Sequence, residues 1–368
     1  MKFSLKRNEV LKEINLVKNV INQNSMKPIL QNMLIEVKED GMVIEGSDLE
    51  VGVRYNLPVY NMEEKGKTTI PADKLYSILN EAPEEEVVFL VENEKAYISS
   101  GETNFTVSVM DPKNYPKFPV IEEEESFTIK FKKLVEMIDK TIIGTAKDSA
   151  RYVFRGILFE IKNNILNLVS TDSHILGKAS AEIKDLSSKE SLRVVVPRKI
   201  LEEIIRIEYE GDVRVLYNKK NIQFQFDDVI LVSRLIDAKY PKYEKVIPSI
   251  NDKKAIVKKE DLLESFKRIS AFIKSDTGRV SLFLEEDELK LEARLDELGK
   301  AEDKLKVKYS DKNMRLDINY KYLKDILRTV DRENILLDMY DGESAIIVKT
   351  EEDENFFWVI MPLAIFDQ

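Results

Sequence analysis

Residues 237–248 read DAKYPKYEKVIP, and residues 111–121 read DPKNYPKFPVI. Both stretches contain Tyr-Pro-Lys followed by an aromatic residue, first at Tyr115 and again at Tyr240. The segments around them also recur at intervals of about 125 residues, and a fixed period is the sequence signature of a repeated structural unit. The repeated phrase therefore indicates that the chain contains copies of one domain.

Three copies of the flanking segments can be recognised. Stretches that combine a short strand with a long amphipathic run begin at Phe3, Phe127 and Ala255, and a second run follows each of them. A length of 368 residues suits three domains of about 120 residues. We expect linkers at the acidic run 122–125 and around Ser249. The expected domains are 1–122, 126–248 and 252–368.

Each repeat combines helical and strand-like patterns. Apolar residues at Leu11, Ile14, Val17 and Ile21 recur at helical spacing, which predicts a helix packed on one face. Short alternating segments separated by turn residues predict antiparallel strands. The fold class is therefore α+β, with each repeat placing two helices against a mostly antiparallel sheet. The six predicted helices are 6–20, 72–81, 131–147, 197–207, 258–274 and 320–332.

The bulk composition limits the class of protein. The chain is 43% hydrophobic and 34% charged, and it contains no cysteine, which excludes disulfides and thiolate metal sites. The first ten residues lack the apolar core of a secretory signal. The longest apolar run, 356–366, contains Pro362 and is too short to span a bilayer. We expect a cytoplasmic protein with no membrane partner.

The charges are distributed unevenly. The net charge is −10, but the six predicted helices carry about +8 and the remainder about −18. An acidic body with basic helices suits a protein that contacts a polyanion with one surface. Ordinary lysine-rich helices facing solvent would give a similar pattern, so charge alone leaves both interpretations open.

The sequence offers little for catalysis. The single histidine, His174, lies in STDSHILGK beside Ser170, Ser173 and Asp172, without the flanking pattern of a nucleophile elbow. With no cysteine and one histidine, a zinc site is not expected. The stretch GKTT at 66–69 lacks the earlier glycine of a phosphate-binding loop. We therefore expect no catalytic residue, metal or cofactor.

Several motifs, in order along the chain, resemble the bacterial sliding clamp family, the beta subunit of DNA polymerase III. TDSHILG at 171–177 resembles the family signature Thr-Asp-Gly-His-Arg-Leu-Ala, from which it departs at Ser173 and Ile175. Lys245 stands where arginine is common in the family. The further matches are PILQNMLIEV at 28–37, RYVFRGILFE at 151–160, VVVPRK at 194–199, SRLIDAKYPKYEKVIP at 233–248 and VIMPL at 359–363.

The resemblance implies three similar domains per chain and a head-to-tail homodimer that closes as a ring around duplex DNA. Simple geometry agrees with two chains. With packed helices about 10 Å apart, six helices on a circle leave roughly 9 Å clear and twelve leave roughly 28 Å. A B-form duplex is on the order of 20 Å wide. One chain could not surround it, whereas two could.

The resemblance also implies a role and a set of site residues. The chain would be a processivity factor without catalysis that tethers the polymerase III alpha subunit, the clamp loader and other proteins carrying clamp-binding peptides. The residues expected to face DNA without reading sequence are Lys12, Lys18, Lys133, Lys140, Tyr152, Arg198, Lys199, Lys267, Arg268, Lys324 and Arg328. The residues expected to line a partner-peptide pocket are Phe154, Thr171, Ser173, His174, Leu176, Pro241, Val246, Val359, Ile360, Met361 and Pro362. Those expected at the dimer interface are Lys74, Val107, Phe272 and Ile273.

Two other functions remain as alternatives. One is a three-domain adaptor that binds proteins and never encircles DNA. The other is a hydrolase that uses His174 and a nearby serine. For Val359, Ile360 and Phe272, packing within a core is an alternative to a binding role.

Overall fold

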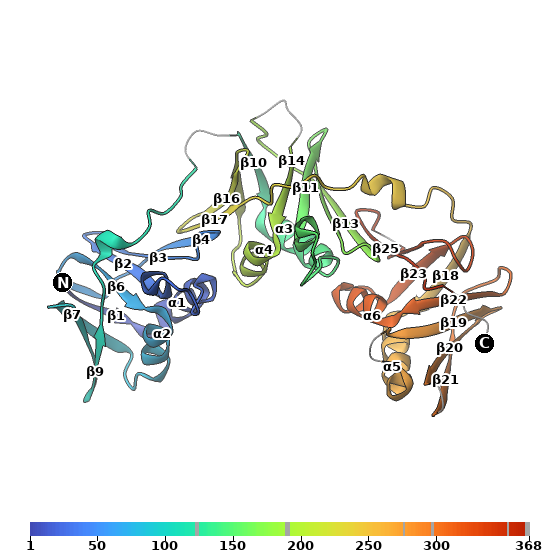
Figure 1. The fold of residues 1–368 in the computed structure, drawn as a ribbon, viewed down its shortest axis with the longest axis horizontal. Helices are drawn as coiled ribbons and strands as arrows, with labels where there is room; N and C mark the ends of the chain where they lie inside the picture. Colours follow the sequence, from blue (N-terminus) through green and yellow to red (C-terminus); the bar gives the residue numbers. More distant parts are fainter. Residues whose placement is uncertain (122–124, 188–191, 275–276, 296–297, 352, 365–368) are drawn as a thin grey trace. The chain divides into compact units, whose positions relative to one another are not determined.

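The computed structural model describes residues 1–121, 125–187, 192–274, 277–295, 298–351 and 353–364. Within these ranges the chain forms six α-helices and 25 strands (Figure 1). Contacts divide the chain into two compact units. The first consists of Met1–Lys132, Lys184–Lys189 and Lys199–Leu235, and the second of Lys133–Ile183, Glu190–Arg198 and Ile236–Gln368.

The first unit contains two antiparallel sheets. The smaller has the strand order β5-β1-β7-β8-β9, and the larger has the order β10-β15-β16-β17-β4-β3-β2-β6. The strands of the smaller sheet are β1 (Lys2–Lys6), β5 (Asn61–Glu64), β7 (Glu86–Glu92), β8 (Lys95–Ser100) and β9 (Thr103–Ser108). Those of the larger are β2 (Asn32–Lys38), β3 (Gly41–Ser47), β4 (Val51–Leu57), β6 (Gly66–Pro71), β10 (Glu125–Lys130), β15 (Asp212–Tyr217), β16 (Asn221–Phe226) and β17 (Val229–Arg234).

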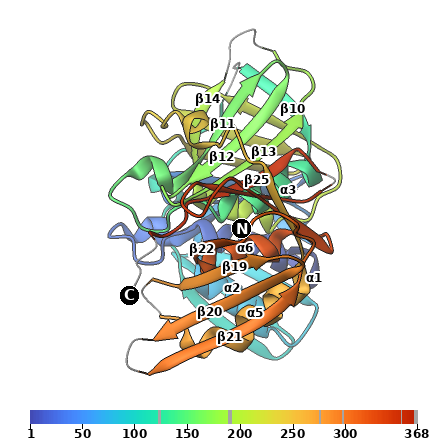
Figure 2. The same cartoon turned by 90° about the vertical axis from the view of Figure 1, so that its right-hand side faces the viewer.

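The second unit repeats this plan. One sheet has the order β14-β11-β12-β13-β25-β24-β23-β18, and the other has the order β21-β20-β19-β22 (Figure 2). The eight strands of the first are β11 (Gly156–Lys162), β12 (Ile165–Thr171), β13 (Ile175–Glu182), β14 (Arg193–Pro197), β18 (Lys253–Lys258), β23 (Asn334–Met339), β24 (Ile346–Lys349) and β25 (Phe356–Ile360). The four of the second are β19 (Arg279–Glu285), β20 (Glu288–Leu295), β21 (Gly299–Lys306) and β22 (Met314–Asn319).

The expectation of a single sheet in each repeat was wrong. Each repeat contributes strands to two different sheets, and each eight-stranded sheet joins strands of two repeats. The joins are the antiparallel pairs β4–β17 and β13–β25. Alternation along a strand indicates which side chains face a core, but it does not identify the neighbouring strand, which is set by long-range packing.

The helices begin close to the predicted positions, and several end earlier. Helix α3 stops at Ile142 rather than at residue 147. The Thr141 hydroxyl donates to the Met137 carbonyl (2.7 Å), and the amide of Gly144 bonds back to Thr141 (3.0 Å). The Arg198 guanidinium binds the Ile142 carbonyl (3.1 Å), so the helix end is satisfied by side chains. The helices are α1 (Arg7–Val20), α2 (Ala72–Glu81), α3 (Phe131–Ile142), α4 (Arg198–Ile205), α5 (Lys259–Ile269) and α6 (Tyr320–Thr329), with 3-10 turns at Pro28–Gln31, Pro112–Asn114, Tyr152–Arg155, Tyr243–Val246 and Ser270–Phe272.

The repeated Tyr-Pro-Lys phrase has the same structural role in both units. Tyr115 is buried, and its hydroxyl lies 3.4 Å from the carbonyl of Glu45 on β3. Tyr240 is also buried, and its hydroxyl lies 3.1 Å from the carbonyl of Val169 on β12. Each tyrosine therefore fastens the segment that leaves a repeat to the third strand of that same repeat.

Of the two expected linkers, the structure describes only the second in full. Residues 122–124 of the acidic run lie outside the described residues, and Glu125 begins strand β10. Around Ser249 the chain has no regular structure until Lys253, where β18 begins.

Candidate functional site

The signature segment forms a tight turn between β12 and β13 in the second unit. The Thr171 hydroxyl donates to the Ile175 carbonyl (2.7 Å) and accepts from the Ser173 amide (3.0 Å). One oxygen of Asp172 accepts the amides of His174 (2.8 Å) and Ile175 (2.9 Å). Ser173, which replaces the family's glycine, has φ of 84° and so lies in the left-handed region that glycine adopts more easily.

Two further contacts hold this turn in place. The other oxygen of Asp172 accepts a hydrogen bond from the Tyr322 hydroxyl (2.9 Å) on α6. Burial and this carboxylate together raise the pKa of Tyr322, so the phenol remains a donor at neutral pH. The amide of Met361 donates to the His174 carbonyl (2.9 Å), which ties the turn to the end of β25. A side-chain bond and a backbone bond therefore hold the turn against α6 and the end of β25.

Three of the predicted pocket residues lie together, and the others differ in exposure. Phe154, Leu176 and Val359 are buried together in a cluster that also contains Tyr240 and Tyr243. Around them Val246 is 51% exposed and Met361 is 43% exposed. Thr171 and Pro362 are half-buried, whereas Ser173, His174 and Pro241 are exposed. A buried apolar cluster and exposed apolar side chains from the same segments are features that would suit an extended peptide inserting apolar side chains.

The structure does not bring Ile360 to this surface. Successive side chains of a strand point to opposite faces of the sheet. Val359 packs with the pocket cluster, whereas Ile360 packs with Ile175 in the core of the third repeat. The prediction that both residues line the pocket was therefore wrong for Ile360, and core packing is its role. Ile175 stands where the family signature has arginine, and its apolar side chain lies in that same core.

One charged cluster that supports the pocket was not predicted. Glu160 on β11 has a side chain only 2% exposed, and it accepts the Tyr243 hydroxyl (2.8 Å). Lys162 (3.0 Å) and Arg193 pair with the same carboxylate. Although burial opposes ionisation, the Tyr243 and Lys162 hydrogen bonds and the charge of Arg193 hold the pKa of Glu160 below its usual range. Tyr243 begins the turn that ends at Val246, so this cluster fixes the pocket rim. A lone glutamate within the apolar run GILFEIK was the available signal.

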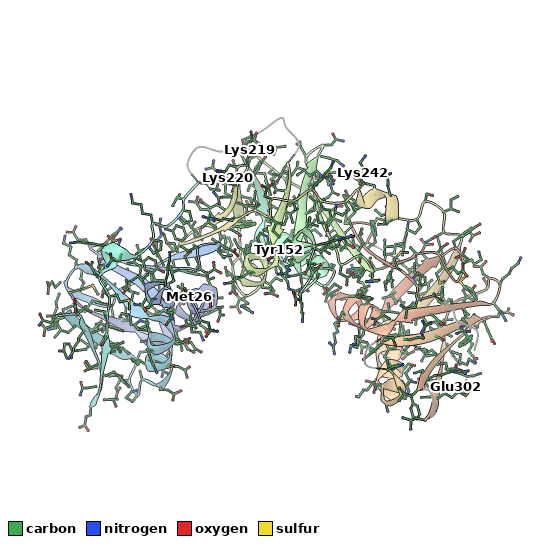
Figure 3. All side chains as sticks on the ribbon, viewed as in Figure 1. Met26, Tyr152, Lys219, Lys220, Lys242 and Glu302 are labelled. Carbon is green, nitrogen blue, oxygen red and sulfur yellow. The ribbon has the colours of Figure 1, made fainter. Side chains whose placement is uncertain are left out.

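The residues expected to face DNA differ widely in exposure. Four are open to solvent: Lys267 (77% of the side chain), Arg328 (65%), Lys12 (47%) and Tyr152 (65% of the residue; Figure 3). Lys12 also pairs with Glu208 (2.6 Å). Arg268 is also exposed (51% of the side chain) and pairs with Asp303 (2.6 Å), whereas Lys267 and Arg328 lie farther from Glu264 (3.6 Å) and Asp325 (3.7 Å). Lys18 and Lys324 lie over the tyrosine rings of Tyr76 (4.2 Å) and Tyr320 (4.9 Å).

The other candidates are held within the fold. Arg198 binds the end of α3 through Ile142 and Thr145, and Lys199 binds the Val20 carbonyl (2.8 Å) and Asp48 (2.6 Å). Lys133 pairs with Glu136 (3.0 Å).

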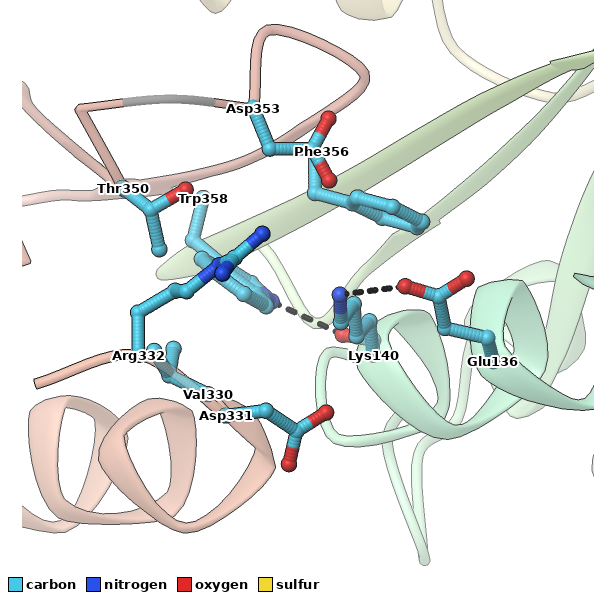
Figure 4. A pocket seen from close by; sticks show the side chains of 9 residues that line it. All are labelled: Glu136, Lys140, Val330, Asp331, Arg332, Thr350, Asp353, Phe356 and Trp358. Atoms are coloured by element: carbon cyan, nitrogen blue, oxygen red, sulfur yellow. Dashed lines mark hydrogen bonds and ion pairs between the residues drawn. The ribbon is translucent and has the colours of Figure 1, made fainter.

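Lys140 is largely enclosed, with a side chain 13% exposed. It pairs with Glu136 (2.8 Å), and its Nζ lies 3.7 Å from the centre of the Phe356 ring. Its carbonyl accepts the Trp358 indole N–H (2.8 Å). These residues line a cavity of about 160 Å³ together with Asp331, Arg332 and others (Figure 4). Lys140 therefore lines a charged cavity, where it is paired with Glu136.

The residues expected at the dimer interface lie near two sheet edges. Val107 is half-buried on β9, the last strand of the five-stranded sheet, and Lys74 is exposed on α2. Phe272 and Ile273 are half-buried and pack against the core of the third repeat. The Phe272 ring lies beside Gly299, the first residue of edge strand β21.

The remaining candidates give no catalytic site. His174 is exposed, and the hydroxyl of its neighbour Ser170 donates to the Thr141 carbonyl rather than to the imidazole. Within the described residues, no group of three metal-ligating side chains is found, and no helix is long and apolar enough to cross a membrane. Fold and site together define a repeat protein with an apolar docking surface.

Comparison with known proteins identifies the family. The N-terminal, central and C-terminal domains of the DNA polymerase III beta subunit match residues 1–119, 128–242 and 244–364. The chain therefore belongs to the DNA polymerase III beta subunit family. The beta sliding clamps of Pseudomonas aeruginosa and Escherichia coli K12 are each 30% identical over 99% of this chain and 100% of their own length.

Solved structures of relatives share the fold. The beta subunit of Thermotoga maritima has a TM-score of 0.92 at 25% identity, and a Pseudomonas aeruginosa sliding clamp bound to griselimycin has a TM-score of 0.94 at 28% identity. Each covers 99% of this chain and 100% of the relative. The family is the non-catalytic processivity factor of DNA polymerase III, so the chain is a sliding clamp subunit in DNA replication and not an enzyme.

Proposed function

We propose that two copies of this chain close head to tail into a ring that encircles duplex DNA in the cytoplasm and holds replication proteins by their clamp-binding peptides. The chain is divided for this purpose into domains 1–122, 126–248 and 252–368. The observation that carries the proposal is a pair of half-sheets whose edge strands, β9 and β21, pair with no second half-sheet in the described part of the chain.

Each repeat contributes two half-sheets of four strands. Within the chain, β6-β2-β3-β4 joins β17-β16-β15-β10, and β14-β11-β12-β13 joins β25-β24-β23-β18. The third repeat retains β22-β19-β20-β21, and the first retains β1-β7-β8-β9, extended by β5. Joining β21 of one copy to β9 of another would make a third sheet of the same composition. A two-fold axis would then supply two such joins and leave neither edge open to aggregation.

The internal joins also predict the register of this contact. Val53 on β4 pairs with Leu231 on β17. Within the hairpins, Ala301 pairs with Ala293 as Val53 pairs with Gly46, so Ala301 on β21 is equivalent to Val53 on β4. Phe105 pairs with Ile98 as Leu231 pairs with Phe224, so Phe105 on β9 is equivalent to Leu231 on β17. We therefore expect Ala301 opposite Phe105 of the partner subunit. Lys74, Val107, Phe272 and Ile273 would then border the contact.

A cysteine pair tests the ring contact directly because the chain contains no cysteine. Phe105→Cys with Ala301→Cys, treated with a short thiol cross-linker, should give a covalent dimer. Each single variant is the matched control and should stay uncoupled. A double variant that remains monomeric in light scattering at micromolar concentration would refute the head-to-tail contact.

We propose that phosphate contacts come mainly from the exposed cations. Lys12, Lys267, Arg328 and the aromatic Tyr152 reach solvent, whereas Lys140 is enclosed. Contacts of this kind are screened by salt and carry no sequence preference, so they permit sliding. Lys267→Ala with Arg328→Ala should reduce the salt slope of DNA binding by about two units. Lys140→Ala should leave that slope unchanged.

Retention on DNA tests encirclement. A clamp loaded on closed circular DNA should resist high salt and be lost when the circle is linearised, because topology rather than grip holds it. An adaptor that merely binds DNA would be lost equally from circular and linear molecules.

The apolar surface around Leu176 and Val359 is proposed to bind partner peptides from the polymerase III alpha subunit and the clamp loader. Met361→Ala with Pro362→Ala should weaken binding of a polymerase peptide at least tenfold in titration, because the exposed rim is removed. Ile250→Ala, which removes another exposed apolar side chain (68%), is the matched control. Unchanged affinity in the double variant would show that this surface is not the pocket.

A further inference from the structure

The first unit contains a turn with the same hydrogen bonds as the signature turn. The Ser47 hydroxyl donates to the Val51 carbonyl (3.0 Å) and accepts the Leu49 amide (3.0 Å). One oxygen of Asp48 accepts the amides of Glu50 (2.9 Å) and Val51 (2.7 Å). Leu49 has φ of 77°, close to the 84° of Ser173. All four bonds of the Thr171–Ile175 turn are therefore reproduced by Ser47–Val51.

The surroundings of this turn are repeated as well. Val51 pairs with Ser233 across the β4–β17 join, as Ile175 pairs with Ile360 across the β13–β25 join. The amide of Arg234 donates to the Glu50 carbonyl (2.9 Å), the counterpart of the bond from Met361 to His174.

The β4–β17 join bears a cavity of about 190 Å³ on its surface. Leu49 at its edge is 43% exposed, and Pro116 from the first Tyr-Pro-Lys phrase forms another part of the wall. The floor is made by Gly52 and the buried Val232. The volume equals that of roughly six liquid water molecules, enough for an inserted apolar side chain.

This cavity differs from the pocket in the second unit at Arg234, which stands where the second unit has Met361, whereas Lys117 has an equivalent there in Lys242. Lys117 and Arg234 line it, and the adjoining hairpin between β15 and β16 carries Lys219 and Lys220 (Figure 3). In the part of the chain that the structure describes, none of these four side chains forms an ion pair. The corresponding hairpin between β23 and β24 instead carries Glu343.

We infer that the β4–β17 join is a second peptide-binding site, which takes an extended acidic segment of a partner protein. An apolar side chain of that segment inserts between Leu49 and Pro116, and its carboxylates face Lys117, Arg234 and the lysine hairpin. Backbone geometry repeated from one join to the other supplies the groove, and the unpaired cations select the sign of the ligand's charge. The inference uses the proposed peptide pocket as its template and is independent of encirclement of DNA.

A pair of labelled peptides tests this site on the full-length protein. The probe is a fluorescein-labelled peptide, Glu-Asp-Leu-Pro-Leu-Glu-Asp, and its matched control has lysine at each acidic position. Fluorescence anisotropy should show that wild type binds the acidic peptide, more weakly as salt is raised, and does not bind the basic one. The variant Lys117→Glu with Arg234→Glu should lose at least tenfold in affinity, and both side chains are exposed, so the fold should be retained.

The pocket of the second unit serves as the internal control. Val246→Ala with Met361→Ala should leave binding of the acidic peptide unchanged within about twofold. The inference is overturned if that variant alone loses the peptide, if the charge-reversed peptide binds equally well, or if wild type binds neither. Loss of the proposed pocket would appear instead as failure to bind a polymerase peptide, which distinguishes the two claims.

Discussion

Glu36 and Glu160 occupy equivalent places in the two eight-stranded sheets, yet their surroundings differ. Each lies near two cations on its own or the adjacent strand. The Glu36 side chain is 32% exposed, whereas that of Glu160 is 2% exposed. One difference is a hydroxyl: Tyr243 donates to Glu160, and the equivalent residue in the first repeat is Phe118.

The comparison teaches how a repeated backbone acquires different functions. In the second unit the buried carboxylate fixes the turn at Tyr243, and that turn carries the exposed Val246 of the pocket rim. In the first unit Phe118 has no hydroxyl, and its ring lies under the Arg54 guanidinium (4.4 Å) and against Gly52. The strands and turns are conserved between the units, while side chains at a few positions determine what each surface can bind.

The largest expected effect comes from removing the buried carboxylate. Glu160→Ala leaves Arg193, Lys162 and the Tyr243 hydroxyl without their acceptor, and we expect the free energy of unfolding to fall by about 2 kcal/mol. Glu36→Ala should change it by less than about 0.5 kcal/mol, because that carboxylate is partly solvated. Urea unfolding followed by circular dichroism measures both. Equal losses would remove the distinction between the two clusters.

The pH dependence of stability provides a second test. The pKa of Glu160 is lowered in the folded state, so its contribution is present above the unfolded pKa, near 4.5, and is lost as pH falls through the folded pKa. Wild type should therefore lose stability relative to Glu160→Gln between about pH 5 and pH 3. Urea midpoints across this range measure the difference. A constant difference would indicate that Glu160 has no lowered pKa.

A smaller effect is expected from the hydroxyl itself. Tyr243→Phe removes one hydrogen bond to a charged group and should cost about 1 to 2 kcal/mol, with weaker peptide binding because the Val246 turn loosens. The reciprocal change, Phe118→Tyr, should be nearly neutral since Glu36 is already solvated. If Phe118→Tyr stabilised the protein as much as Tyr243→Phe destabilised it, the hydroxyl alone would explain the contrast.

The sequence predicted the structural features that depend on local pattern, namely the helices and the repeated domains. Helical spacing gave the helices, and the recurrence of Tyr115 and Tyr240 gave the repeats. It could not show that each repeat divides its strands between two sheets, because strand pairing is determined by contacts distant in sequence. The early end of α3 at Ile142 was missed for a related reason, since the Arg198 guanidinium that binds it comes from another helix. The face of Ile360 follows instead from the alternation of side chains along its own strand.

The candidate site shows the same limit. The resemblance predicted Leu176 and Val359 at the pocket, and the structure places both in one buried cluster. The cluster at Glu160 required knowledge of which strands adjoin β11. The turn Ser47–Val51 shares with Thr171–Ile175 only the pattern of a hydroxyl residue followed by aspartate. That pattern is too short to identify a turn by itself, and it became recognisable once its four hydrogen bonds could be compared.

The smallest expected effect separates the two turns at their left-handed residue. Ser173→Gly relieves the strain of φ at 84° but adds freedom to the unfolded chain, so we expect a net gain of about 0.5 kcal/mol. Leu49→Gly relieves the same strain but also removes an exposed apolar side chain, so its stability should be unchanged or lower while acidic-peptide binding is lost. Thermal unfolding and peptide anisotropy together measure these outcomes. A Ser173→Gly variant less stable than wild type would mean that the serine side chain contributes more to the turn than its backbone strain costs.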